Sequence, residues 1–133
     1  MTPPTAQEIF DTVATHLFTQ GRQARLSNTT CAYRSDDGLK CAIGALIPDD
    51  MYRSEMEGGS PSILITYFPA LRTVFGDSMR LLALLQRAHD NALIWQSTFT
   101  MRMALQRDGS DNIWGNVPVD TSILDTLSFA DGR

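Results

Sequence analysis

The sequence predicts a compact, mainly α-helical domain with five or six helices, several of them short, and one small β-hairpin near residues 31–43. Three observations support this fold class. Apolar residues recur at helical spacing near the N-terminus and again after residue 78. Prolines and glycines divide the chain between these stretches into short segments. A turn signal between two short, partly apolar arms predicts the hairpin.

Length and composition are those of an ordinary globular chain. With 133 residues, of which 43% are hydrophobic, we expect one domain over residues 1–133 with a less regular C-terminal segment, 110–133. No stretch approaches the roughly eighteen consecutive apolar residues of a membrane span. The N-terminus lacks the basic and apolar regions of a signal peptide. We therefore expect a cytoplasmic protein that does not associate with membranes.

The net charge argues against nucleic acid as a partner. The chain carries 11 basic and 15 acidic residues, a formal net charge of −4 at pH 7. A nucleic-acid binder needs a basic face that replaces counterions, but here the basic residues are spread along the chain without a run. We therefore expect no nucleic-acid partner.

The first helix has clear start and stop signals. Thr5 and Glu8 form a capping box, in which each side chain can bind the other residue's backbone N–H. Gly21 stands where a left-handed C-terminal cap is expected. Between these signals, the apolar residues that repeat on one helical face are Ile9, Phe10, Val13, Ala14, Leu17 and Phe18.

The hairpin is predicted from residues 35–38, Ser-Asp-Asp-Gly, a sequence typical of a tight turn. With Asp36 and Asp37 in the loop, Arg34 faces Leu39 and Ala32 faces Cys41. The second arm then passes into a short buried helical turn, which Pro48 ends. The alternative is a single helix over residues 39–47, because short apolar runs do not distinguish the two by period alone.

The later helices follow from capping residues and prolines. Ser60 and Pro61 start a short helix, and Pro69 starts a second one that Gly76 ends. Asp77 or Ser78 caps a wide-faced helix that we expect to be central, and its apolar residues are Leu81, Leu82, Leu84, Leu85 and Ala88. A last main helix is expected over residues 97–107, followed by a short helix capped by Asp120.

Cys41 and His89 are the pair that an enzyme hypothesis would use. A cysteine nucleophile needs its thiolate, which a helix start and a nearby imidazole favour. Asp90 is a poor candidate to orient His89, because adjacent residues on a helix point about 100° apart. The other interpretation of Cys41, which we favour, is a small buried hydrophobic residue in an apolar run.

Metal and cofactor sites are not predicted. The four side chains that zinc would use are Cys31, Cys41, His16 and His89, but they lack the close pairing of a structural zinc site. The chain also has no phosphate-binding glycine loop. In a cytoplasmic protein the two cysteines are expected to be reduced, and the hairpin register argues against a disulfide between them.

The acidic segment over residues 49–57 is the predicted partner-binding site. It combines acidic residues with methionine and tyrosine, which are adaptable contact residues. We expect it to face a partner with a basic surface. The contact residues are Asp49, Asp50, Tyr52, Glu55, Met56 and Glu57. The alternative is a loop whose apolar residues fold back on the core.

Three motifs occur in a fixed order: Tyr-Arg at 33–34, Gly-Leu-Lys-Cys-Ala-Ile-Gly at 38–44 and Leu-Ile-Pro-Asp at 46–49. In them the chain resembles a group of small uncharacterised proteins from phages and prophage-bearing bacteria. The opening helix and the Leu-rich helix that ends in His89 and Asp90 are similar too, so the resemblance covers about the first hundred residues. It implies a phage or mobile-element setting and assigns no catalytic residue. In that setting, the expected location is the cytoplasm of the host cell.

The function that these observations favour is that of a small, non-enzymatic binding protein of phage type, for example an inhibitor of a host defence or regulatory protein. One alternative is a cysteine-dependent hydrolase or deamidase that uses Cys41 and His89. Another is a protein that binds a small ligand in a pocket between the hairpin and the Leu-rich helix. These three classes stay open on the sequence.

Overall fold

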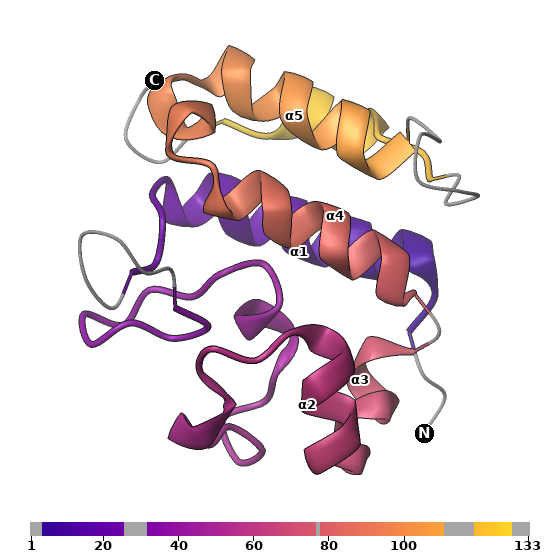
Figure 1. Cartoon of the computed structure of the whole chain (residues 1–133). Coiled ribbons are helices and arrows are strands. Elements are labelled where there is room, and N and C mark those ends of the chain that lie inside the picture. The colour runs from indigo at the N-terminus through magenta and orange to yellow at the C-terminus, as the bar shows by residue number, and fades with distance from the viewer. Residues whose placement is uncertain (1–3, 26–31, 77, 111–118, 129–133) are drawn as a thin grey trace.

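The computed structural model describes residues 4–25, 32–76, 78–110 and 119–128, and the side chains of Ala92 and of residues 108–110 are not included. The described chain is mainly helical, which confirms the predicted fold class. Figure 1 shows three tiers. The upper tier is α5 (Thr98–Ser110), the middle tier is α1 (Ala6–Gln20) with α4 (Met79–Asp90), and the lower tier is α2 (Pro61–Tyr67), α3 (Arg72–Phe75) and the irregular segment 32–59.

Helix α1 forms as its sequence predicts. Thr5 Oγ1 accepts the backbone N–H of Glu8 at 3.1 Å, and Glu8 Oε1 accepts that of Thr5 at 2.9 Å. Gly21, at φ 75°, is the left-handed cap, and its N–H donates to the carbonyl of Leu17. All six predicted apolar residues of α1 are fully buried.

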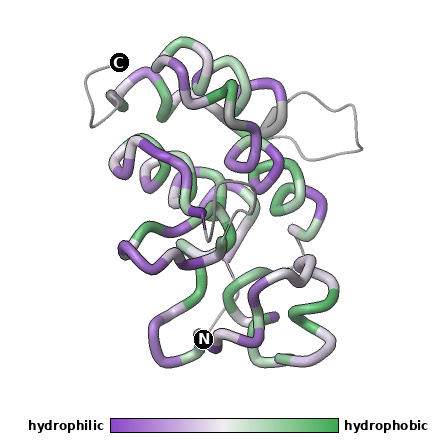
Figure 2. Tube along the Cα trace, turned by 60° about the vertical axis from the view of Figure 1, so that its left-hand side comes forward, coloured by the Kyte–Doolittle hydropathy of each residue, from purple (hydrophilic) through white to green (hydrophobic). Residues whose placement is uncertain are grey.

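Helix α4 is the central helix, because it contacts α5 above, α1 beside it and α2 below. The five apolar residues that the sequence placed on it are buried, and so is His89. The core joins α4 to the apolar run after the turn: Cys41, Ile43, Leu82 and Leu85 are all buried in one cluster. Figure 2 shows polar and apolar residues alternating along the helices, as expected for helices that bury one face.

The predicted hairpin is not formed as two strands. Within the described residues, this region has a turn over 35–38 closed by one antiparallel bridge between Arg34 and Lys40. Arg34 therefore faces Lys40, so the predicted pairing with Leu39 is wrong by one residue. The physical reason lies in the loop: Ser35 N–H donates to the carbonyl of Leu39 at 2.9 Å, which places five residues rather than four between the bridged positions.

The second arm passes into a helical turn, as expected, here the 3₁₀ helix η1 (Gly44–Leu46), in which only Gly44 is buried. Ile47 then turns extended before Pro48, with ψ 117°. At Gly44 the chain lies directly against the preceding arm. A Cβ atom added there would be 2.0 Å from the backbone oxygen of Tyr33, so only glycine fits.

The remaining elements are short. The 3₁₀ helix η2 (Ser54–Met56) lies in the acidic segment, and Ser60 caps α2 through the N–H of Ile63. Pro69 begins η3 (Pro69–Leu71), which continues into α3 and ends at Gly76. Ser78 precedes α4 without a capping hydrogen bond, while the alternative cap, Asp77, lies outside the described residues. The last two are η4 (Ala92–Gln96) and η6 (Ser122–Thr126).

Among the described helices, none combines the length and the apolar character that crossing a membrane requires. The helix predicted over residues 97–107 is α5, which continues to Ser110. Of its apolar residues, Met101, Ala104 and Leu105 face the core.

Candidate functional site

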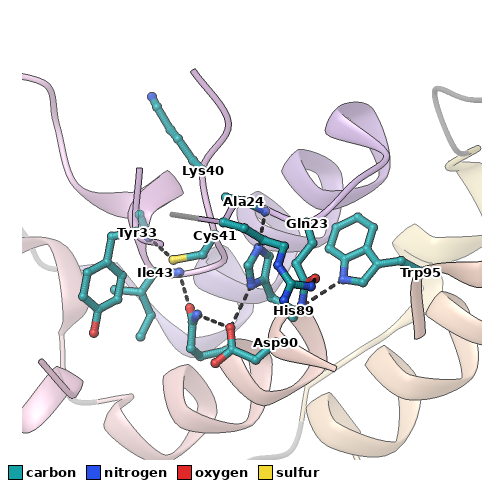
Figure 3. A network of polar contacts seen from close by, with 12 residues as sticks. Gln23, Ala24, Tyr33, Lys40, Cys41, Ile43, His89, Asp90 and Trp95 are labelled. Atoms are coloured by element: carbon teal, nitrogen blue, oxygen red, sulfur yellow. Dashed lines mark hydrogen bonds and ion pairs between the residues drawn. The ribbon is translucent and has the colours of Figure 1, made fainter. Parts of the chain in front are cut away.

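The His89 side chain lies fully buried at the C-terminal end of α4. Its Nε2 atom accepts the backbone N–H of Ala24 at 3.0 Å, so the ring proton must be on Nδ1. Nδ1 then donates to Asp90 Oδ1 at 2.9 Å. The Trp95 ring packs edge-on against the imidazole, with 5.6 Å between the ring centroids. Figure 3 shows the imidazole held between Ala24 and Asp90.

The expectation that Asp90 is a poor candidate to orient His89 is wrong. Adjacent helical side chains do diverge, but α4 ends at Asp90 and the next residue, Asn91, is already extended. At this helix end the carboxylate reaches back to Nδ1. Asp90 Oδ1 also accepts a hydrogen bond from Gln86 Nε2 at 2.8 Å, and Gln86 Oε1 accepts the N–H of Ile43 at 3.1 Å. A continuous polar network therefore links α4 to the arm that carries Cys41.

The Cys41 thiol is fully buried, and its Sγ accepts the N–H of Gly44 at 3.2 Å. Burial raises the pKa of this thiol to about 12, and the charge of Asp90 also raises it, against the opposing effect of the Gly44 N–H. The thiolate is thus disfavoured at neutral pH. The hydrolase hypothesis needs the opposite, a thiolate at neutral pH.

His89 is also unsuited to act as the base for Cys41. Ala24 occupies one ring nitrogen and Asp90 the other. The imidazole instead joins the segment after α1 to α4. The geometry therefore supports a structural role for both Cys41 and His89.

Alkylation kinetics test this interpretation of Cys41. Because the thiol is buried and its pKa is raised, native protein should react with iodoacetamide far more slowly than urea-unfolded protein at pH 8. The Cys41 adduct is quantified by mass spectrometry at that residue, which separates it from Cys31. Fast native modification of Cys41 that His89→Ala abolishes would restore the hydrolase hypothesis.

Of the four side chains considered for zinc, the three that the structure describes do not form a metal site. His16 Nε2 lies 3.0 Å from the carbonyl of Lys40, and burial lowers the pKa of His16. Cys31 lies outside the described residues, so the structure does not address a disulfide between Cys31 and Cys41. Across the described ranges, no group of three His, Cys, Asp or Glu residues is arranged to hold a metal ion.

Glu57 in the acidic segment binds this protein's own backbone. Its Oε1 accepts the N–H of Tyr33 at 2.9 Å, and its Oε2 accepts the N–H of Arg34 at 3.1 Å and the hydroxyl of Tyr52. The Arg34 guanidinium lies over the Tyr52 ring, 4.7 Å from its centroid. Glu57 and Tyr52 therefore fasten the acidic segment to the turn region.

The expectation that Met56 lies at the surface is wrong. Its side chain is 1% exposed and belongs to the core cluster. The alternative, in which an apolar residue of the loop folds back on the core, is the correct one for Met56. The 3₁₀ helix η2 turns this side chain inward, a local reversal that charge pattern alone does not reveal.

The other three acidic residues of the segment are exposed: Asp49, Asp50 and Glu55. Asp49 pairs with Arg34 at 2.8 Å and approaches Lys40 at 3.8 Å, but its side chain is 85% exposed, so water screens the pair.

A hollow of about 340 Å³ adjoins this segment, a feature that the sequence did not indicate. Asp50 and Arg53 lie on its acidic-segment side, and Tyr67 lies on the α2 side. Its apolar lining includes Met51, Met56, Phe68, Pro69, Ala70 and Leu71. Tyr67 is 75% exposed, and Ile63, one turn earlier on α2, is about half exposed. The only signal in the sequence was the apolar character of α2, which by itself does not indicate a binding surface.

A second cavity, of about 500 Å³, lies beside α4 and is called the α4 cavity below. Its walls come from three parts of the chain: residues 32–33, residues 57–61 and one face of α4. The α4 residues that line it are Ala83, Gln86, Arg87 and Asp90. This is the place, between the turn region and the Leu-rich helix, where the sequence suggested a small-ligand pocket.

Comparison with protein-family models, curated proteins and solved structures found no match to this chain.

Proposed function

We propose that this chain is a non-enzymatic binding protein that recognises a protein partner through an acidic–aromatic face. This face consists of Asp49, Asp50 and Glu55 on the acidic segment and of Ile63 and Tyr67 on α2. The observation that carries the proposal is the apolar hollow with Asp50 and the exposed Tyr67 on its rim. Exposed aromatic residues beside a hollow are typical of binding hot spots.

The chemistry of the face defines the partner. The three exposed carboxylates favour a basic surface, and the hollow accepts one apolar side chain between the acidic segment and α2. Arg53 at the same hollow disfavours a cationic group inside it, so the partner's basic residues belong at the rim. Glu57 and Tyr52 hold the acidic segment in place, whereas Met56 lines the hollow and would contact the partner's apolar side chain.

The biological setting rests on the resemblance to the group of phage and prophage proteins. In that setting the partner is a host protein, such as a defence or regulatory protein that the binder inhibits. Host-cell cytoplasm is the corresponding location.

Association and dissociation rates test the acidic–aromatic face. The partner is captured from host lysate with the wild-type protein, identified and purified, and each variant is then measured against it. The double variant Asp50→Lys with Glu55→Lys should slow association roughly tenfold and flatten its salt dependence, because complementary charge speeds encounter. Tyr67→Ala should instead speed dissociation by roughly tenfold or more, because a central aromatic anchor is lost.

Phe99→Ala is the matched control, since Phe99 is an aromatic residue of similar exposure, 71%, on α5 in the opposite tier. It should leave both rates unchanged. If Phe99→Ala weakens binding and the α2 and acidic-segment variants do not, the interface lies on α5 and the proposed face is wrong.

A further inference from the structure

The α4 cavity is built on a regular stripe of one helix. Ala83, Gln86, Arg87 and Asp90 follow the spacing i, i+3, i+4 and i+7, so they lie along one face of α4. Leu81, Leu82 and Leu85 on the rest of the helix are fully buried and hold it in place. A core helix that keeps a mainly polar stripe beside a cavity presents its polar groups to whatever occupies that cavity.

Hydrogen bonds hold three polar groups of this cavity in position. The Gln86 amide is held between the N–H of Ile43 and the carboxylate of Asp90. The Glu57 carboxylate is held by the backbone N–H groups of Tyr33 and Arg34. A ligand entering the cavity therefore meets two carboxylates that need little reorganisation, which lowers the cost of binding.

The cavity carries charges of both signs. Glu57 and Asp90 supply two carboxylates, and Arg87 supplies a guanidinium. Burial is the main cause that raises the pKa of Tyr33, but Glu57 and Asp90 both raise it too, which indicates that both carboxylates act on the same region. A ligand with a single charge would face repulsion from one of these groups, whereas a ligand with both charges matches them.

Small residues leave room for such a ligand. Ala32, Ala83, Gly58 and Gly59 all line the cavity. Its volume of about 500 Å³ falls in the usual range for small-molecule sites.

We propose that the α4 cavity binds a small zwitterionic molecule of the amino-acid or dipeptide class. Its ammonium group faces Glu57 and Asp90, and its carboxylate faces Arg87, since a guanidinium binds a carboxylate through two hydrogen bonds. This site shares no lining residue with the hollow of the acidic–aromatic face and does not require a protein partner.

The test uses glycylglycine as the zwitterionic probe, with propylamine and propionate as probes that each carry one of its two charges. Each is titrated into the full-length, ¹⁵N-labelled protein at low salt, and backbone amide shifts are followed. Glycylglycine should shift the amides of Gly58, Gly59 and Arg87 in a saturable way. The two single-charge probes should bind at least about tenfold more weakly, because each loses one charge contact.

Two variants and a control locate the site. Arg87→Gln removes the cation, and Ala83→Phe fills the cavity without altering a charge. Each should weaken glycylglycine binding about tenfold or more. Arg80→Gln is the matched control, because Arg80 is exposed on the same helix but does not line the cavity. Far-ultraviolet circular dichroism confirms that each variant is folded.

The proposal is overturned if glycylglycine gives no saturable shift up to about 10 mM, which is weaker than useful small-molecule affinity. It is also overturned if propylamine binds as tightly as glycylglycine, or if Arg80→Gln weakens glycylglycine binding as much as Arg87→Gln does. Because no partner protein enters this experiment, its failure does not affect the proposal of the acidic–aromatic face. Likewise, failure of the partner-binding experiment does not affect the proposal of the ligand site.

Discussion

Replacing Gly44 with alanine should lower the free energy of unfolding by about 3 kcal/mol or more. The added Cβ would lie 2.0 Å from the backbone oxygen of Tyr33 and 2.8 Å from its carbonyl carbon. Backbone atoms cannot rotate away as the end of a flexible side chain can, so the two chain segments must separate. That movement would disrupt the hydrogen bond from Cys41 N–H to the Tyr33 carbonyl, which measures 3.2 Å. Urea unfolding followed by circular dichroism measures the loss.

Gly59→Ala is the matched control for this substitution. A Cβ at Gly59 would meet its nearest atoms, in Met56 and Ile63, at 3.4 Å, an ordinary contact distance. The same chemical change should therefore alter stability by less than about 1 kcal/mol. Equal losses at Gly44 and Gly59 would show that the close approach to Tyr33 does not limit what residue 44 can be.

His89→Ala should lower stability by about 3–5 kcal/mol, from a cavity in the core and an unsatisfied buried N–H. The backbone amide of Ala24 loses its acceptor, and Trp95 loses the ring against which it packs. Native-state hydrogen exchange gives a local readout, because the Ala24 amide should lose protection more than the amides of α1 do.

Two milder variants separate the contributions of His89. His89→Gln keeps a side-chain oxygen that can accept the Ala24 N–H, so it should recover part of the stability that alanine loses. Asp90→Asn keeps an oxygen acceptor toward His89 Nδ1 and should cost only about 1 kcal/mol. If His89→Ala costs no more than Asp90→Asn, the bond to Ala24 does not stabilise the fold and the structural role assigned to His89 is wrong.

Local signals in the sequence were sufficient where the interacting residues are close in the chain. The capping box of α1 joins Thr5 to Glu8, and Gly21 caps the same helix. Ser60 caps α2 by accepting the N–H of Ile63, three residues later in the chain, and Pro69 begins η3. These interactions depend on backbone geometry over one helical turn, which residue type largely determines.

Long-range contacts decided the features that the sequence misassigned. Met56 resembled a surface residue because its neighbours are charged, yet η2 turns it into the core. Glu57 resembled a partner contact, yet its carboxylate binds two backbone N–H groups more than twenty residues away. The cost of burying those N–H groups without an acceptor holds Glu57 inward.

By itself, the sequence determined the helical fold class, the bounds set by caps and prolines, and the apolar faces that α1 and α4 bury. Apolar periodicity and capping depend on residues close together in the chain, so they can be recognised in the sequence. Only the tertiary structure decided the role of His89, the orientation of Asp90 and the position of the hollow. The role of His89 depends on its bond to Ala24, a residue distant in the chain, because the requirement to pair buried donors and acceptors selects that contact. The hollow depends on how the acidic segment packs beside α2 and η3.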